Sequence, residues 1–130
     1  MTLQPASGAR DLNPQQVRKN HLIASKLSSL YQLWGYERIS PPHIERLDTL
    51  TAAGGISNNE ILKIVSDEPL GLRPEITASI VRAASTRFNE YERPLRFWST
   101  GTSFKCNQSI DGGIDIEESF QSGVELIGTK

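Results

Sequence analysis

The last strand-like run of the sequence, EESFQSGVELIG, carries polar residues at a spacing that could hold a small ligand. Because side chains alternate between the two faces of a strand, Gln121, Gly123 and Glu125 share one face. Because the glycine has no side chain, the surface between the carboxamide and the carboxylate is open. A small ligand could lie there between two hydrogen-bonding groups, with the glycine as the floor of the site. The same spacing also fits an ordinary solvated face with the glycine at a bulge, and both interpretations stay open at this point.

Three further residues could contribute to chemistry. In the stretch LRPEIT, Glu75 and Thr77 lie at a predicted junction between a strand and a helix, where a carboxylate can bind a ligand or interact with the helix dipole. Lys105 places a cation on the first strand of the final hairpin, either for an anionic ligand or as a surface lysine. His21 and His43 lack a carboxylate or serine at a catalytic spacing, so we assign no catalytic role to them.

Composition and charge exclude several classes of function. The 14 basic and 15 acidic residues give a net charge of −1, so the sequence predicts no nucleic-acid binding. The single cysteine, Cys106, cannot form an intramolecular disulfide or a cysteine-based metal cluster, and without an activating histidine it is interpreted as an inert buried thiol. No apolar run reaches the roughly 20 residues of a membrane span, and the N-terminus lacks a signal-peptide core. We therefore expect a cytoplasmic protein with no membrane association.

Two helices are predicted. The first begins after Asn13, with Pro14 at the first helical position and Gln16 completing a capping box, and it ends at Gly35. The second spans residues 74–88, with a proline at its first position. The apolar residues of the first helix are expected to cover a sheet or a partner: Val17, Leu22, Ala24, Leu27, Leu30, Tyr31 and Trp34.

The remaining segments predict strands. The run YERIS ends at Pro41 and Pro42, which cannot donate to a central ladder, so we expect an edge or interface strand. Residues 51–60 are expected to form a loop, and residues 61–72 a short hairpin. Residues 94–106 and 117–128 should pair as a long antiparallel hairpin.

On the last strand, one face is expected to be core-like, namely that of Phe120, Ser122, Val124 and Leu126. The order of elements does not alternate regularly between strand and helix. It favours one α+β domain over residues 1–130, with an antiparallel sheet flanked by helices.

Several motifs resemble the catalytic core of histidyl-tRNA synthetases in the same order along the chain: ASGARDLNP, WGYERISPP, LRPEIT, FKCNQ and QSGVELIG. The resemblance covers nearly the whole chain and implies a partial class II aminoacyl-tRNA synthetase-like core. It places Pro42 in the first class II signature, a dimer-interface strand, and residues 104–128 in the second, a hairpin that holds ATP. It also implies that four residues bind histidine: Glu75, Thr77, Gln121 and Glu125.

The sequence departs from the synthetase pattern at the ATP-binding positions. The second signature begins Phe-Arg-x-Glu in synthetases, whereas residues 104–107 read FKCN, so Lys105 replaces the guanidinium that clamps the α-phosphate. The following loop, where synthetases place arginines, is acidic and is expected to repel ATP. Its acidic residues are Asp111, Asp115, Glu117 and Glu118. We also expect the domain to end before the third signature and before any anticodon-binding domain.

The sequence keeps the residues that bind histidine in synthetases but departs from them at the ATP-binding positions. In this combination it resembles the regulatory subunits of ATP phosphoribosyltransferase, which are paralogues of the synthetases in histidine biosynthesis. This resemblance implies a subunit with no catalytic residue, cofactor or metal. It also implies three partners: a short-form catalytic subunit, L-histidine as effector, and a second copy in a homodimer. Two alternatives remain open, namely an N-terminal portion of a divergent histidyl-tRNA synthetase and a free-standing amino-acid-binding module.

Overall fold

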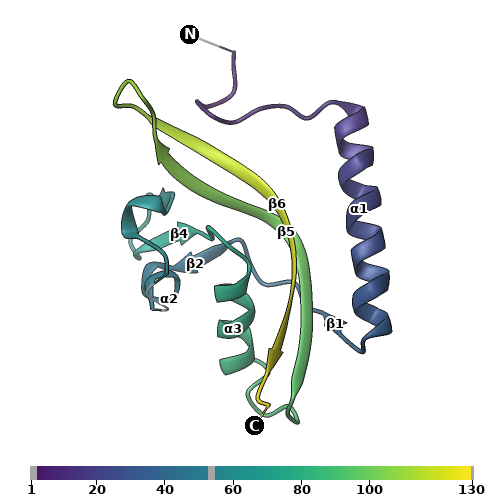
Figure 1. Ribbon diagram of the computed structural model, residues 1–130. Coiled ribbons are helices and arrows are strands. Elements are labelled where there is room, and N and C mark those ends of the chain that lie inside the picture. Colours follow the sequence, from purple (N-terminus) through teal and green to yellow (C-terminus); the bar gives the residue numbers. More distant parts are fainter. Residues whose placement is uncertain (1–2, 53–54, 130) are drawn as a thin grey trace.

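A computed structural model describes residues 3–52 and 55–129 as an arrangement of helices around a long, curved hairpin (Figure 1). Two residues of the predicted 51–60 loop, Ala53 and Gly54, and the last residue of the predicted domain, Lys130, lie outside the described residues. The elements in chain order are α1 (Pro14–Leu33), β1 (Glu37–Arg38), β2 (Ile44–Arg46), α2 (Leu47–Thr51), the 3-10 helix η1 (Asn58–Glu60), β3 (Lys63–Ile64), β4 (Leu70–Leu72), α3 (Thr77–Ser85), β5 (Leu95–Gln108) and β6 (Ile114–Ile127).

Helix α1 begins at the predicted capping box. The backbone N–H of Gln16 donates to Asn13 Oδ1 at 2.8 Å, and the backbone N–H of Asn13 donates to Gln16 Oε1 at 2.9 Å. These two bonds satisfy groups that a helix start otherwise leaves unpaired. The helix ends before Gly35, whose φ of +78° is a conformation that glycine adopts without strain. The predicted boundaries of this helix are confirmed.

Strands β5 and β6 pair in continuous antiparallel register, from Leu95 opposite Ile127 to Gln108 opposite Ile114. β1 pairs with β5 in parallel and lies at the edge of this sheet, which has the order β1-β5-β6. The α+β class and the predicted edge strand are therefore confirmed, although the sheet is mixed because of β1. A second sheet, β2-β4-β3, contains the predicted short hairpin as β3 and β4.

The predicted 51–60 loop and the second helix differ from the structure in detail. The loop contains the end of α2 and the 3-10 helix η1. Helix α3 starts at Thr77, with Ile76 at its N-cap position, so the prediction that Pro74 opens the helix is wrong. Pro74 lies instead in the buried connection from β4, a segment fixed by backbone hydrogen bonds of Arg73 to other parts of the fold.

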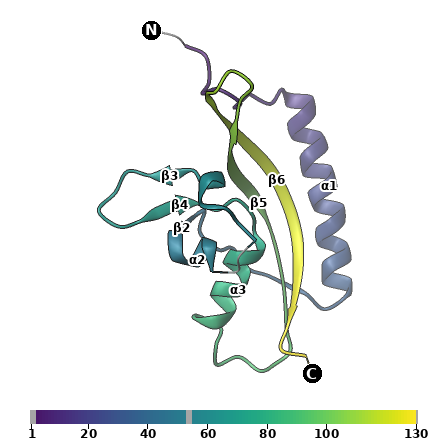
Figure 2. The ribbon, with the colours of Figure 1, turned by 60° about the vertical axis from the view of Figure 1, so that its left-hand side comes forward.

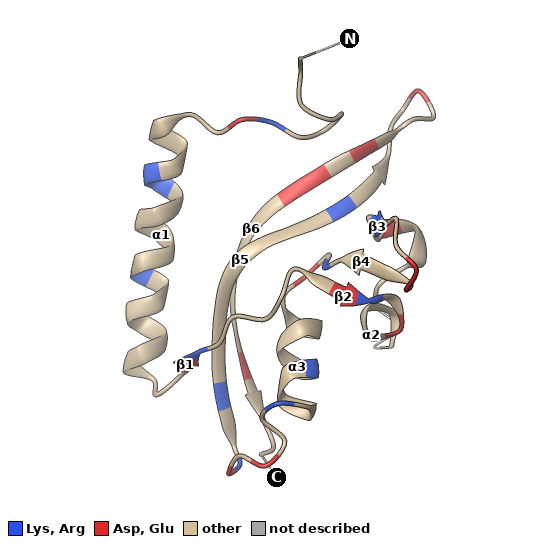
Figure 3. Cartoon of the chain, turned by 180° about the vertical axis from the view of Figure 1, so that it is seen from behind, with Lys and Arg blue, Asp and Glu red and all other residues tan. Residues whose placement is uncertain are grey.

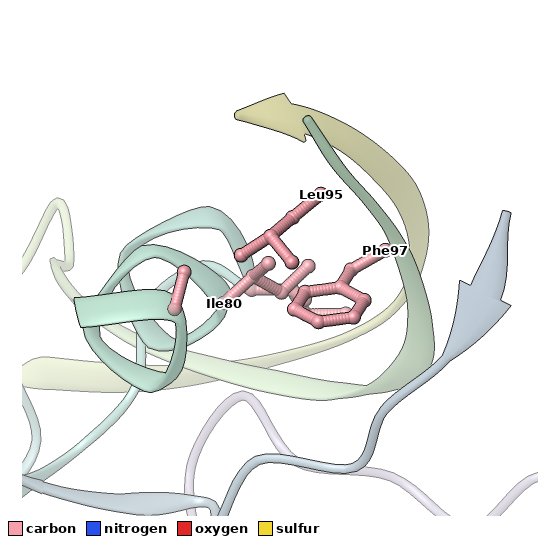
Figure 4. Close-up of a cluster of buried hydrophobic side chains, with 5 residues drawn as sticks. Ile80, Leu95 and Phe97 are labelled. Atoms are coloured by element: carbon pink, nitrogen blue, oxygen red, sulfur yellow. The ribbon is translucent and has the colours of Figure 1, made fainter. Parts of the chain in front are cut away.

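The hydrophobic core lies between α3 and the β5–β6 hairpin. Ile76, Ile80 and Ala84 pack against Leu95 and Phe97 of β5 (Figure 4). Ile39, Phe88 and Ile127 extend this cluster. The core is therefore on the side of the hairpin that α3 covers.

The prediction that the Phe120 face of β6 is core-like is wrong. Phe120, Val124 and Leu126 are 51%, 37% and 47% exposed. The reason is that α3 packs on the opposite face, where Ile127 joins the core cluster. Burial on this strand is thus decided by the position of a helix distant in sequence.

Helix α1 runs along the other side of the hairpin from α3 (Figures 1 and 2). The Tyr31 ring lies 5.5 Å from the Trp98 ring, and the Tyr31 hydroxyl lies 3.1 Å from Ser122 Oγ. No α1 residue is fully buried. Its large apolar side chains that remain exposed are Val17, Leu22, Ile23, Leu30 and Leu33.

The N-terminal segment crosses the hairpin near its tip. The backbone N–H of Ile116 donates to the Ser7 carbonyl at 2.7 Å. Gly8 adopts a φ of +88°, and a Cβ there would lie 2.2 Å from the Ile116 carbonyl oxygen. This close approach requires glycine at position 8. Of the helices in residues 3–52 and 55–129, none combines the length and hydropathy needed to cross a membrane.

The core generates a stability prediction for two neighbouring residues of α3. Ile80→Ala should lower the free energy of unfolding by about 2 to 5 kcal/mol, because Ile80 is 1% exposed and its loss leaves a cavity. Val81→Ala, at a residue 44% exposed, should change it by only about 0.5 kcal/mol. Urea denaturation monitored by circular dichroism measures both values. Equal losses in the two variants would contradict the assignment of this core.

Candidate functional site

A cavity of about 450 Å³ lies between the start of α3 and strand β6. The structure brings together in its wall all four residues that the resemblance assigned to histidine, although they come from two distant parts of the sequence. The lining residues are Glu75, Ile76, Thr77, Ile80, Phe120, Gln121, Ser122, Gly123 and Glu125.

Gly123 forms an open part of the cavity floor. A Cβ built at this position would meet no atom within 4 Å. The glycine pairs regularly with Ser99 within the continuous β5–β6 register, so there is no bulge at this point. Of the two interpretations of this glycine, the structure favours a floor on which a ligand can rest.

Hydrogen bonds fix two polar side chains of the cavity wall, those of Glu125 and Gln121. Thr77 Oγ1 donates to Glu125 Oε1 at 2.9 Å, which joins the start of α3 to β6. Ser103 Oγ donates to Gln121 Oε1 at 2.6 Å. Because this bond occupies the amide oxygen, the Gln121 amide nitrogen is the group that can donate to a ligand, while the Glu125 carboxylate retains a second oxygen as an acceptor.

The charge of the cavity favours a ligand with a cationic group. Glu75 and Glu125 contribute carboxylates, and no lysine or arginine is among the described residues that line the cavity. Glu75 lies one position before the N-cap residue of α3, so it does not cap the helix. An ammonium or imidazolium group would complement these carboxylates.

A buried arginine that the sequence analysis missed lies near this site. Arg73 is 2% exposed; its Nε donates to the Thr102 carbonyl at 3.1 Å and its Nη1 to the Pro41 carbonyl at 3.2 Å. Burial lowers the pKa of Arg73, and the nearby Glu45 carboxylate opposes this shift. A signal was present in the sequence, because Gly101 within a strand is typical of a close approach by another group.

Lys105 is not among the residues that line this cavity. It lies opposite Glu117 in the hairpin, and the Asn107 side-chain amide donates to Glu117 at 2.7 Å. Figure 3 shows acidic residues along this end of β6 and at the hairpin tip. At the tip, hydrogen bonds led by that from the Ser109 hydroxyl lower the pKa of Asp111. The hairpin end therefore presents mainly negative charge.

The other residues considered in the sequence analysis lie apart from the cavity. Pro42 is exposed in the connection between β1 and β2, and His43 packs edge-on against Phe104 with the ring centroids 6.2 Å apart. His21 lies on the exposed surface of α1, and Cys106 is only partly buried. The predicted burial of the Cys106 thiol is thus incomplete.

Comparison with known proteins relates this fold to one family. The family description "Histidyl-tRNA synthetase" matches residues 8–130. An ATP phosphoribosyltransferase regulatory subunit from Prochlorococcus marinus (strain NATL1A) is 99% identical over the whole chain, which spans 33% of that relative's length.

Two solved structures share the fold. An ATP phosphoribosyltransferase regulatory subunit/histidyl-tRNA synthetase from Bacillus halodurans C has a TM-score of 0.86 and 27% identity, over 99% of this chain and 33% of that one. A histidine–tRNA ligase subunit from Alicyclobacillus acidocaldarius has a TM-score of 0.82 and 25% identity, over 100% of this chain and 37% of that one. Because the family match extends over nearly the whole described fold, the chain belongs to the histidyl-tRNA synthetase family.

Proposed function

We propose that the chain belongs to a non-catalytic regulatory subunit of ATP phosphoribosyltransferase, which activates a short-form catalytic subunit in histidine biosynthesis and takes part in feedback by histidine. The observation that carries this proposal is the cavity in which Glu75, Thr77, Gln121 and Glu125 meet. The near identity to a relative with that regulatory name supports it. The single cysteine, which cannot form an intramolecular disulfide, supports a cytoplasmic location.

The cavity offers complementary groups for an amino acid such as histidine. Glu75 and Glu125 can accept hydrogen bonds from the ligand's ammonium or ring nitrogen atoms. The Gln121 amide nitrogen can donate, because Ser103 already occupies its oxygen. Thr77 holds Glu125 by a hydrogen bond and so orients one of the carboxylates. The Gly123 floor leaves space for the ligand between these groups.

The outer half of the hairpin supports a role without adenylation. Lys105 presents a single ammonium where the synthetase pattern has a guanidinium that binds phosphate at two points. Opposite it, Glu117 is held by Asn107. Because Asp111 in the turn and Asp115 near the start of β6 add further carboxylates, a polyphosphate brought to this end of the hairpin would meet several negative charges.

The alternative is an active histidyl-tRNA synthetase, which the likeness to the Alicyclobacillus ligase subunit favours. We expect the chain to catalyse no histidine-dependent exchange between ATP and pyrophosphate, because Lys105 and the acidic hairpin do not stabilise the charge of the transferred group. A radiolabelled pyrophosphate exchange assay measures this, with an active histidyl-tRNA synthetase as the positive control. Robust exchange by the purified chain would favour the synthetase.

The regulatory function predicts a histidine response in the mixed complex. When the chain is mixed with a short-form catalytic subunit, transferase activity should rise, and histidine should reverse this effect with a coupling of about 1 to 3 kcal/mol. Glu125→Gln and Gln121→Ala should lose the histidine response, whereas Glu118→Gln, an exposed carboxylate outside this cavity, should keep it. Activity is measured as the formation of phosphoribosyl-ATP across a histidine titration.

Two negative results of this experiment would have different meanings. If the catalytic subunit neither binds the chain nor changes its activity, the regulatory proposal is wrong. If the complex forms and both cavity variants keep full histidine sensitivity, only the site assignment is wrong.

We also propose a homodimer through α1 and the segment that contains Pro42. Ile23 and Leu30 of α1 and Trp34, the residue that follows the helix, lie close to one stripe. They are 48%, 48% and 73% exposed, an apolar surface suited to a self-complementary interface. Leu30→Glu should shift the mass measured by light scattering from dimer to monomer. Arg18→Glu, a charge change at an exposed position on a different side of the same helix, should leave the dimer intact. A wild-type monomer well above micromolar concentration would contradict the proposal.

A further inference from the structure

Arg73 is a fully buried cation to which the proposed function gives no role. Arginine is rarely buried to this extent unless its donors are paired. Arg73 follows β4 directly and precedes the cavity residue Glu75 by two positions. Its environment therefore bears directly on where Glu75 and Thr77 lie.

The backbone and the side chain of Arg73 connect three parts of the fold. The guanidinium donates to the carbonyls of Pro41 and Thr102. The Arg73 N–H donates to the His43 carbonyl at 2.9 Å, and its carbonyl accepts from the Phe104 N–H at 2.9 Å. The segment leading to the cavity is thus joined to the 41–43 connection on one side and to β5 on the other.

The guanidinium also occupies the space above Gly101. A Cβ at position 101 would lie 2.4 Å from Arg73 Nη2. Gly101 pairs directly with Gln121, and paired residues of an antiparallel ladder project from the same face. Arg73 therefore lies on the same sheet face as Gln121, next to the Ser103 hydroxyl bond that orients the Gln121 amide.

Arg82 can be compared with Arg73, because both arginines interact with the carboxylate of Glu45. The two oxygens of Glu45, which is 6% exposed, share the Nε–H of Arg82 at 3.0 and 3.1 Å, and the Glu45 carboxylate also interacts with Arg73 through its charge. Arg82 lines a different cavity, beside Pro41 and Pro42. The two arginines thus share one carboxylate, but only Arg73 occupies the space above Gly101.

We propose that Arg73 is a positioning residue for the candidate histidine site. Its planar guanidinium, held by two carbonyls above Gly101, sets the separation between the Glu75–Thr77 segment and the strand that carries Gln121 and Glu125. Lysine cannot reproduce this arrangement, because an ammonium is a point charge without a planar fork of donors. The inference rests on the proposed function of that site and adds to it a residue that does not line the cavity.

The test compares Arg73→Lys with Arg82→Lys, which keep the charge of the network. Isothermal titration calorimetry with L-histidine should show roughly tenfold or greater weakening for Arg73→Lys, the scale of losing one hydrogen bond of a charged group. Arg82→Lys should stay within about twofold of the wild type, since that group does not reach the site. Circular dichroism and urea denaturation confirm that each variant is folded.

A second readout requires no ligand. In the NMR spectrum of the unliganded chain, Arg73→Lys should shift the side-chain amide resonances of Gln121, whereas Arg82→Lys should not. If Arg73→Lys does not fold, Gly101→Ala replaces it, because the added methyl group displaces the guanidinium while Arg73 is retained.

Each result has a definite meaning. Wild-type affinity in Arg73→Lys, or equal losses in the two lysine variants, would overturn the positioning role. If the wild-type chain binds no histidine, the site assignment of the proposed function fails. The positioning role is then decided by the Gln121 resonances, and unchanged resonances in Arg73→Lys would overturn it.

Discussion

The continuous antiparallel pairing of β5 with β6 is the constraint on which the rest of this structure depends. The register places Gln121, Gly123 and Glu125 together on the face that α3 covers. A slip of one residue would transfer all three to the α1 face, because side chains alternate along a strand. The pairing also places Gly101 opposite Gln121, where the buried guanidinium of Arg73 fits. The fold and the candidate site are therefore specified by the same ladder.

Features encoded by local sequence were predictable. The Asn13–Gln16 capping box involves residues three positions apart, and the glycine-rich turn between β5 and β6 is equally local. The start of α3 was placed too early, because a proline suits a first helical turn but Pro74 lies in a buried connection held by tertiary hydrogen bonds. Local sequence therefore indicates which secondary structure a segment can form, whereas contacts with distant residues decide where the helix or strand begins and ends.

The candidate site was predictable only in part. Resemblance grouped Glu75, Thr77, Gln121 and Glu125, and the structure places all four around one cavity. Alternation along β6 correctly separated its two faces, but it could not show which face α3 would cover, so the core-like face was assigned wrongly. The contacts of Arg73 were not predicted, because its partners, the carbonyls of Pro41 and Thr102, are about 30 residues away in each direction along the chain. The carbonyl acceptors themselves leave no side-chain pattern in a sequence, so the signal of this contact was the glycine at position 101.

The contact between the N-terminal segment and β6 affects how the sheet meets its surroundings. Within the described residues β6 is an edge strand, and an exposed edge offers unpaired backbone groups on which another strand can add. Near the hairpin tip, the hydrogen bond from Ile116 to Ser7 occupies one of these groups, and Gly8 lies directly against the strand. This segment thus shields the tip end of the edge from strand addition. Removing it would leave unpaired backbone groups exposed next to Ile114, an apolar residue already 68% accessible, and would favour self-association through this edge.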